Sequence, residues 1–67
     1  MNQFAERLKE LRLEKGLTME ELAKATQIGS SSISRWEKCQ ADIKSSQLII
    51  LAKYFGVTTD YLLGLEN

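Results

Sequence analysis

Residues 18–38 of this 67-residue chain read TMEELAKATQIGSSSISRWEK, and this stretch decides the fold. Thr18 is followed three positions later by Glu21, a spacing typical of the capping box that satisfies two backbone amides at a helix start. A tight turn is expected at residues 26–29, and a second helix over residues 30–38. The stretch therefore predicts two short helices joined by a tight turn.

The second of these helices has one buried and one exposed side. Ile33 and Trp36 are three positions apart, so they share a face and are expected in the core. Trp36 could instead stack on a nucleic-acid base, but its spacing from Ile33 favours the core. A helix whose leading edge carries short polar groups and one arginine can lie close to the base edges of DNA. Here those outward residues are Ser30, Ser31, Ser34 and Arg35.

Three blocks of sequence extend the pattern over nearly the whole chain: LKELRLEKGLTMEELA at residues 8–23, ISRWEK at 33–38 and LAKYFGVTTDYLLG at 51–64. With these blocks in this order, the chain resembles the helix-turn-helix domains of the phage repressor and Cro type, also called the xenobiotic-response-element (XRE) family. The resemblance implies an all-α fold, a compact five-helix bundle with a central helix-turn-helix as in lambda repressor. It also implies one DNA-binding domain over residues 1–67 and a bacterial or phage origin.

The residues themselves also indicate five helices without strands. The chain has no proline, and residues 48–55 place Leu48, Leu51, Ala52 and Phe55 on one apolar stripe expected in the core. Ile49 and Ile50 cannot both face inward with that stripe, so one of them is expected to be partly exposed. Capping residues predict the helix ends. Asn2 can cap a first helix that runs to about Lys15 and ends at Gly16. Ser45 starts the fourth helix and Gly56 stops it, and Thr58 or Thr59 caps a fifth helix that Gly64 ends.

Composition restricts the compartment and the chemistry. The single cysteine, Cys39, rules out an internal disulfide framework and fits a reducing cytosol. No apolar run approaches the length of a membrane span, so the chain is expected to be soluble, cytoplasmic and without membrane contact. Without histidine there is no imidazole base and no histidine metal ligand. We therefore expect no enzyme activity, no metal site and no cofactor, and the sequence indicates no small-molecule ligand.

The charge balance is unusual for a DNA-binding protein. Nine basic residues face nine acidic ones, so the formal net charge is zero, whereas nucleic-acid binders usually carry a basic excess. A positive surface would therefore require the fold to turn acidic residues away from the DNA. We expect weak, salt-dependent binding per monomer, so that a homodimer, at least on DNA, is needed for useful affinity.

The resemblance assigns the DNA contacts. In the family, the N-terminal end of the second motif helix enters the major groove and meets base edges. Arg35 is the best candidate for a base contact, because bidentate arginine to guanine is the commonest specific pairing. A phosphate-bound or merely solvated Arg35 is the alternative. The matching base-contact positions are Gly29, Ser30, Ser31, Ser34 and Arg35. The candidate phosphate contacts are Thr18, Met19, Lys24, Lys38, Gln40 and Lys44.

Several residues depart from the family pattern. Met19 replaces a glutamine that commonly grips a phosphate, so only backbone amides remain to hold one there. Gln27 replaces a glycine, and a left-handed backbone at that position would cost roughly 1 kcal/mol. Cys39 replaces the glycine that commonly follows the second motif helix, the one that reads DNA in the family. Ile43 replaces a proline in the next loop. These departures make the DNA affinity less predictable than the fold.

Two further features are expected to be structural. In the resembled family, positions matching Arg12 and Glu37 form a buried or half-buried ion pair that sets the angle of the reading helix. Near the C-terminus, Tyr61, Leu62 and Leu65 carry more apolar area than a solvated end needs. They are candidates for a dimer interface, although some of them are expected to pack back on the first helix.

Two functions remain open. The first is a sequence-specific DNA-binding transcriptional regulator, a repressor that binds double-stranded DNA at an inverted-repeat operator as a dimer. The second is a protein-interaction or antitoxin-like module on the same scaffold, with a weakened DNA face. Zero net charge and Met19 support the second function, and the three sequence blocks support the first.

Overall fold

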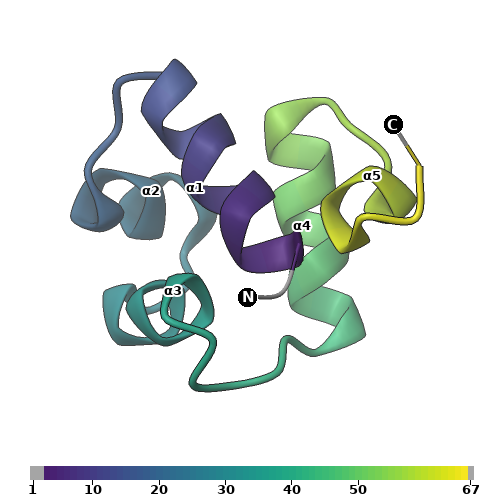
Figure 1. Ribbon diagram of the computed structural model, residues 1–67. Helices are drawn as coiled ribbons and strands as arrows, with labels where there is room; N and C mark the ends of the chain where they lie inside the picture. Colours follow the sequence, from purple (N-terminus) through teal and green to yellow (C-terminus); the bar gives the residue numbers. More distant parts are fainter. Residues whose placement is uncertain (1–2, 67) are drawn as a thin grey trace.

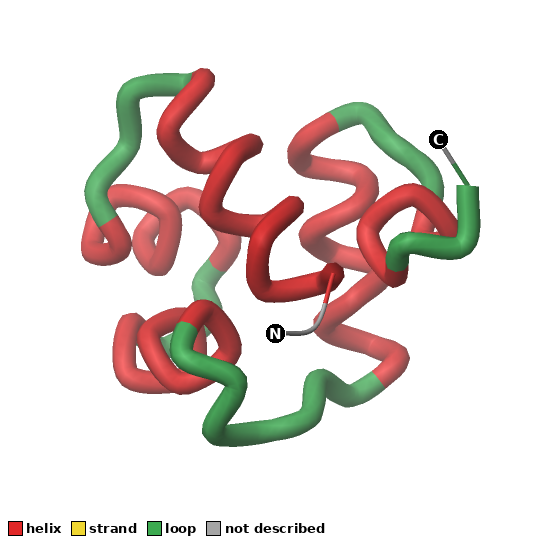
Figure 2. The backbone as a smooth tube through the Cα atoms, viewed as in Figure 1, coloured by secondary structure: helices red, strands yellow, loops and turns green. Residues whose placement is uncertain are grey.

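The computed structural model describes residues 3–66, which form five α-helices and no strand. Helix α1 passes through the middle of the view in Figure 1, with α2 and α3 on one side and α4 and α5 on the other. Figure 2 shows that the loop between α3 and α4 is the longest connection. The predicted all-α bundle is confirmed. Its helices are α1 (Gln3–Glu14), α2 (Met19–Thr26), α3 (Ser30–Glu37), α4 (Ser45–Phe55) and α5 (Thr59–Leu63).

Side-chain caps are present at the starts of α2 and α5. The Thr18 amide donates to Glu21 Oε1 at 2.8 Å, and the Glu21 amide donates to Thr18 Oγ1 at 3.1 Å, so the capping box is confirmed. At α5 the cap is Thr58, whose hydroxyl accepts from the Tyr61 amide at 3.0 Å. Gly29 is the N-cap of α3 and provides no side-chain hydrogen bond. The predicted Asn2 cap lies outside the described residues.

The core takes one fully buried aliphatic side chain from every helix. In addition, Phe4 and Trp36 meet edge to face, with ring centroids 6.2 Å apart, and join α1 to α3. Trp36 is 3% exposed, so its predicted place in the core is confirmed. Because each helix buries its own anchor, none of the five can leave without opening the core. The five anchors are Leu8, Leu22, Ile33, Leu51 and Leu62.

Two predictions about apolar side chains are corrected. Leu62 was a candidate for a dimer interface, but it is fully buried, because α5 packs on both α1 and α4 and turns this residue inward. The exposed residue beside it is Leu63, at 39%. Ile49 and Ile50 are both exposed, at 46% and 42%, whereas only one was expected to be, because α4 turns Leu48, Leu51 and Ala52 inward and leaves both isoleucines on its other side.

Two non-glycine residues adopt the left-handed backbone conformation, one on each side of α3. Gln27, which ends α2, has φ of 60°, and so does Cys39 beyond the end of α3. These are the two positions where the resembled family commonly has glycine. Each side chain therefore strains the backbone at a turn next to α3. In the part of the chain that the structure describes, no helix has the length and apolar character that crossing a membrane requires.

Candidate nucleic-acid interface

An ion pair between Arg12 and Glu37 fixes α3 against α1. Arg12 Nε donates to Glu37 Oε2 at 2.8 Å and Nη2 donates to Oε1 at 3.0 Å, which is the bidentate geometry that gives strong charge-assisted bonds. A third bond runs from Nη1 to the Leu17 carbonyl oxygen at 2.8 Å. The side chains of the pair are only 10% and 3% exposed. One guanidinium therefore joins α1, the following loop and the end of α3.

The electrostatics of the pair agree with this geometry. The hydrogen bond to Glu37 raises the pKa of Arg12 above its ordinary value; burial acts in the opposite direction, and the charge of Glu37 adds to the increase. The guanidinium is therefore charged at any pH at which the protein would be used. Because Arg12 and Glu37 neutralise each other inside the fold, neither charge contributes to a surface that meets phosphates.

The N-terminal end of α3 presents an open polar edge. Gly29, Ser30, Ser31 and Arg35 are exposed, and Ser34 is half-buried, while Ile33 and Trp36 hold the opposite side of the helix in the core. Among residues 3–66, the side chains of Ser30, Ser31 and Arg35 form no hydrogen bond or ion pair. The leading edge of α3 is thus free to bind a partner outside the chain.

The candidate phosphate contacts fall into two groups. Lys24, Lys38, Gln40 and Lys44 are all exposed. At the start of α2 the situation differs, because the Met19 side chain is half-buried against the core and the Thr18 hydroxyl already accepts a bond within the capping box. Backbone amides in the first turn of α2 and the hydrogen of the Thr18 hydroxyl are left to hold an anion there.

The fold does not turn every acidic residue away from these candidate phosphate contacts. Glu37 is neutralised by Arg12, which leaves Arg35 as the charged group on the exposed edge of α3. However, Asp42 is exposed in the α3–α4 loop, between Gln40 and Lys44. Any anion held by this loop would meet a carboxylate among its contacts.

The sequence profile described as "Helix-turn-helix" matches residues 8–62. The chain belongs to this family. Its Cro and phage-repressor type is the one that the three sequence blocks resemble. Members of the family are DNA-binding transcription regulators and not enzymes, in agreement with the sequence prediction.

Named relatives share the sequence over nearly the whole chain. The HTH-type transcriptional regulator ImmR of Bacillus subtilis (strain 168) is 39% identical over 64 residues, which cover 96% of this chain and 50% of ImmR. The HTH-type transcriptional activator BcrR of Enterococcus faecalis is 38% identical over 65 residues, covering 97% of this chain and 32% of BcrR. The chain thus spans half or less of the length of these curated relatives.

Solved structures agree in fold. The restriction-modification controller protein C.AhdI from Aeromonas hydrophila has a TM-score of 0.81 at 30% identity, covering 90% of this chain and 91% of C.AhdI. The P22 c2 repressor, solved in complex with a synthetic operator, has a TM-score of 0.88 at 24% identity and covers 98% of this chain and 100% of that one. At that identity the P22 likeness shows the fold alone.

Proposed function

We propose that residues 1–67 form the single DNA-binding domain of a cytoplasmic transcriptional regulator, a repressor that binds an inverted-repeat operator as a dimer. In this proposal α3 lies in the major groove of each half-site. The observation that carries it is the exposed, unpartnered leading edge of α3 on a helix that the Arg12–Glu37 pair holds in place. Family membership supports DNA as the ligand.

Arg35 is the residue that we propose reads a base. It is the long cationic side chain on the exposed edge, and its guanidinium can donate two hydrogen bonds to a guanine. Ser30 and Ser31 have hydroxyls that donate or accept, so they tolerate several bases and discriminate little. Gly29 and Ser34 lie beside them and complete the proposed base-contact surface. Specificity per half-site is then expected to depend mainly on Arg35.

The proposed phosphate contacts orient α3 in the groove without reading sequence. Lys24, Lys38, Gln40 and Lys44 would bind phosphates through their exposed side chains, and the start of α2 at Thr18 and Met19 through its backbone. Few cations are available, and Asp42 lies among them, so a single copy is expected to bind weakly. Two copies on adjacent half-sites would gain affinity from their linkage.

For the dimer interface we propose the C-terminal face made of Tyr61, Leu63 and Leu65. Leu63 and Leu65 are 39% and 72% exposed, while Tyr61 is half-buried beneath the guanidinium of Arg7, which lies 4.2 Å from the centroid of its ring. Leu63 takes the place of the buried Leu62 that the sequence suggested. Apolar area of this kind is a common core for an interface between copies.

The test is selection of bound duplexes from a random DNA pool at low salt, followed by sequencing. Enrichment of an inverted repeat with half-sites about one helical turn apart supports a dimeric operator-binding regulator. Enrichment of a single half-site would refute the dimer and keep the DNA-reading role. Transcription from a reporter carrying the selected site then separates repression from activation.

A protein-interaction module is the second candidate function. It is favoured by the neighbouring exposed side chains Ile49 and Ile50 on α4 and by the zero net charge. If folded protein enriches no duplex in the selection, this second function replaces the first. A pull-down that loses its partner with Ile49→Ser and Ile50→Ser, but not with Leu13→Ser, would then support it.

A further inference from the structure

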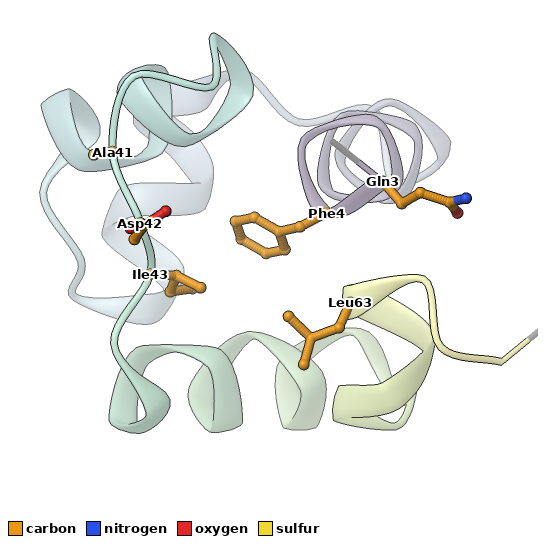
Figure 3. Close-up of a pocket in the computed structure, with 6 residues that line it drawn as sticks. All are labelled: Gln3, Phe4, Ala41, Asp42, Ile43 and Leu63. Carbon is orange, nitrogen blue, oxygen red and sulfur yellow. The ribbon is translucent and has the colours of Figure 1, made fainter. Parts of the chain in front are cut away.

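An open cavity of about 360 Å³ lies between the start of α1, the α3–α4 loop and the end of α5. Figure 3 shows the side chains of Phe4, Ile43 and Leu63 converging on it from these three segments, while Gln3 points away. The cavity falls within the size range of small-molecule sites, which are mostly apolar with a few polar groups. Its lining is Gln3, Phe4, Ala41, Asp42, Ile43 and Leu63.

Among the described residues that line the cavity, Asp42 is the only charged one. It is exposed at the edge that the loop forms, and within residues 3–66 its carboxylate makes no hydrogen bond or ion pair. The Gln3 side chain already takes part in a hydrogen bond, since its oxygen accepts from Arg7 Nη2 at 3.4 Å. An apolar floor with one free carboxylate at its edge complements a ligand that has an apolar body and one positive charge.

Two of the segments that line the cavity connect it to α3. Phe4, which forms its floor, packs edge to face on Trp36 of α3. The loop that forms its wall follows α3 directly, and in the described chain residues 41–43 take part in no backbone–backbone hydrogen bond. Ile43, partly buried against the core, is therefore the main anchor of this loop. A segment held so loosely is one whose position a ligand can bias.

We propose that this cavity binds a small organic ammonium ion with an apolar body, and that the bound cation strengthens DNA binding. The second half of the proposal rests on the proposed function. Pairing with the ammonium group neutralises Asp42 between the proposed phosphate contacts Gln40 and Lys44, and the apolar body fills the space behind Ile43 and fixes the loop. By linkage, DNA must tighten the binding of the cation by the same factor.

The first experiment needs no DNA. The ¹⁵N-labelled protein is titrated with 2-phenylethylamine and with hexylamine, each against the alcohol of the same body, 2-phenylethanol and 1-hexanol. We expect saturable shifts at the amides of Asp42, Ile43 and Leu63 for at least one amine, with a millimolar Kd for so small a ligand. The matching alcohol is expected to bind at least about threefold more weakly, because it lacks the charge. Equal binding of amine and alcohol, shifts confined to other residues, or no saturation by either amine would overturn the site.

A matched pair of variants isolates the carboxylate. Asp42→Asn should reduce the affinity for the amine to that of the alcohol. Asp60→Asn changes the only other aspartate, which is also exposed, and should leave the affinity unchanged. An Asp42→Asn variant that still prefers the amine would also overturn the proposal. Because Asp42 has no partner within the described residues, its replacement is not expected to disturb folding.

The second experiment tests the coupling with the selected duplex, by fluorescence anisotropy at constant ionic strength, since salt alone weakens DNA binding. The amine should tighten binding by on the order of fivefold, and this gain should vanish in Asp42→Asn. An unchanged DNA affinity while the amine saturates the protein would refute the coupling. Failure to bind any duplex with or without amine would instead refute the proposed function, while the first titration still judges the cation site.

Discussion

Replacing Arg12 with methionine should be among the most destabilising exchanges in this chain. Methionine keeps the apolar stem of the side chain but removes both bonds to the Glu37 carboxylate, which is 3% exposed, and the bond to the Leu17 carbonyl. Removing one partner of a buried pair costs about 3–5 kcal/mol. Arg12 keeps 10% exposure, which places the cost near the lower limit, about 3 kcal/mol.

That cost is large for a domain of this size. A domain of 67 residues is stable by about 3–10 kcal/mol, and 1 kcal/mol corresponds to about 4–8 °C in Tm. Arg12→Met should therefore lower the Tm by at least about 12 °C, measured by circular dichroism. Urea unfolding at 25 °C provides the free energy independently.

Two further variants test the structural role of the Arg12–Glu37 pair. Arg12→Met with Glu37→Leu removes both charges, and we expect it to recover most of the loss, because apolar replacement of a whole buried pair is close to neutral. Arg35→Met, an exposed arginine without a partner among the described residues, is the matched control and should change stability by less than about 0.5 kcal/mol. An unchanged Tm in Arg12→Met, or a double variant as unstable as the single one, would contradict the structural role of the pair.

The pH dependence follows from the direction of the Arg12 pKa. Its folded pKa is raised, so its stabilising contribution is fully present below the ordinary arginine pKa and is lost only as pH rises through the higher folded value. The Tm difference between the wild-type protein and Arg12→Met should therefore not shrink between about pH 7 and about pH 10. A difference that declines over this range would mean that another titrating group supports the pair.

Three further predictions concern single side chains. Arg35→Ala should cost about 1–3 kcal/mol of specific DNA binding and relax one base position, measured by anisotropy on single-base variants of the site; an equal loss on every sequence would make Arg35 a phosphate contact. Gln27→Gly and Cys39→Gly should each raise stability by about 1 kcal/mol in urea unfolding, because glycine relieves the left-handed backbone at φ of 60°; a loss in either would show that its side chain contributes more than the strain costs. Met19→Gln should tighten DNA binding without changing sequence preference, and no gain would indicate that the start of α2 does not meet the backbone.

Removing the charge of Asp42 tests where this carboxylate lies relative to the DNA phosphates, and the result bears on both proposals. If the α3–α4 loop lies along phosphates, Asp42→Asn should tighten DNA binding even without an amine, and it should steepen the salt dependence relative to Asp60→Asn. Both quantities come from anisotropy titrations at several salt concentrations. If the two variants have the same affinity and the same salt dependence, Asp42 lies away from the phosphates.

Helix ends were predictable from sequence because capping acts over three or four residues. The Thr18–Glu21 box and the helix stop at Gly56 depend on groups adjacent in the chain, so their geometry follows from residue type. The burial of Ile33 and Trp36 followed equally from helical periodicity. The family resemblance extended this local information to the order of the five helices and to the pairing of Arg12 with Glu37.

Tertiary packing decided what periodicity left open. Helix α5 has five residues, too few for a pattern to tell which of Leu62 and Leu63 faces inward, and only its docking on both α1 and α4 buries Leu62. The third bond of Arg12, to Leu17, depends on how the loop after α1 folds back. The cavity beside Phe4 exists only because the α3–α4 loop passes the start of α1 and the end of α5. Contacts between residues far apart in the chain depend on the three-dimensional path of the backbone, which no local pattern encodes.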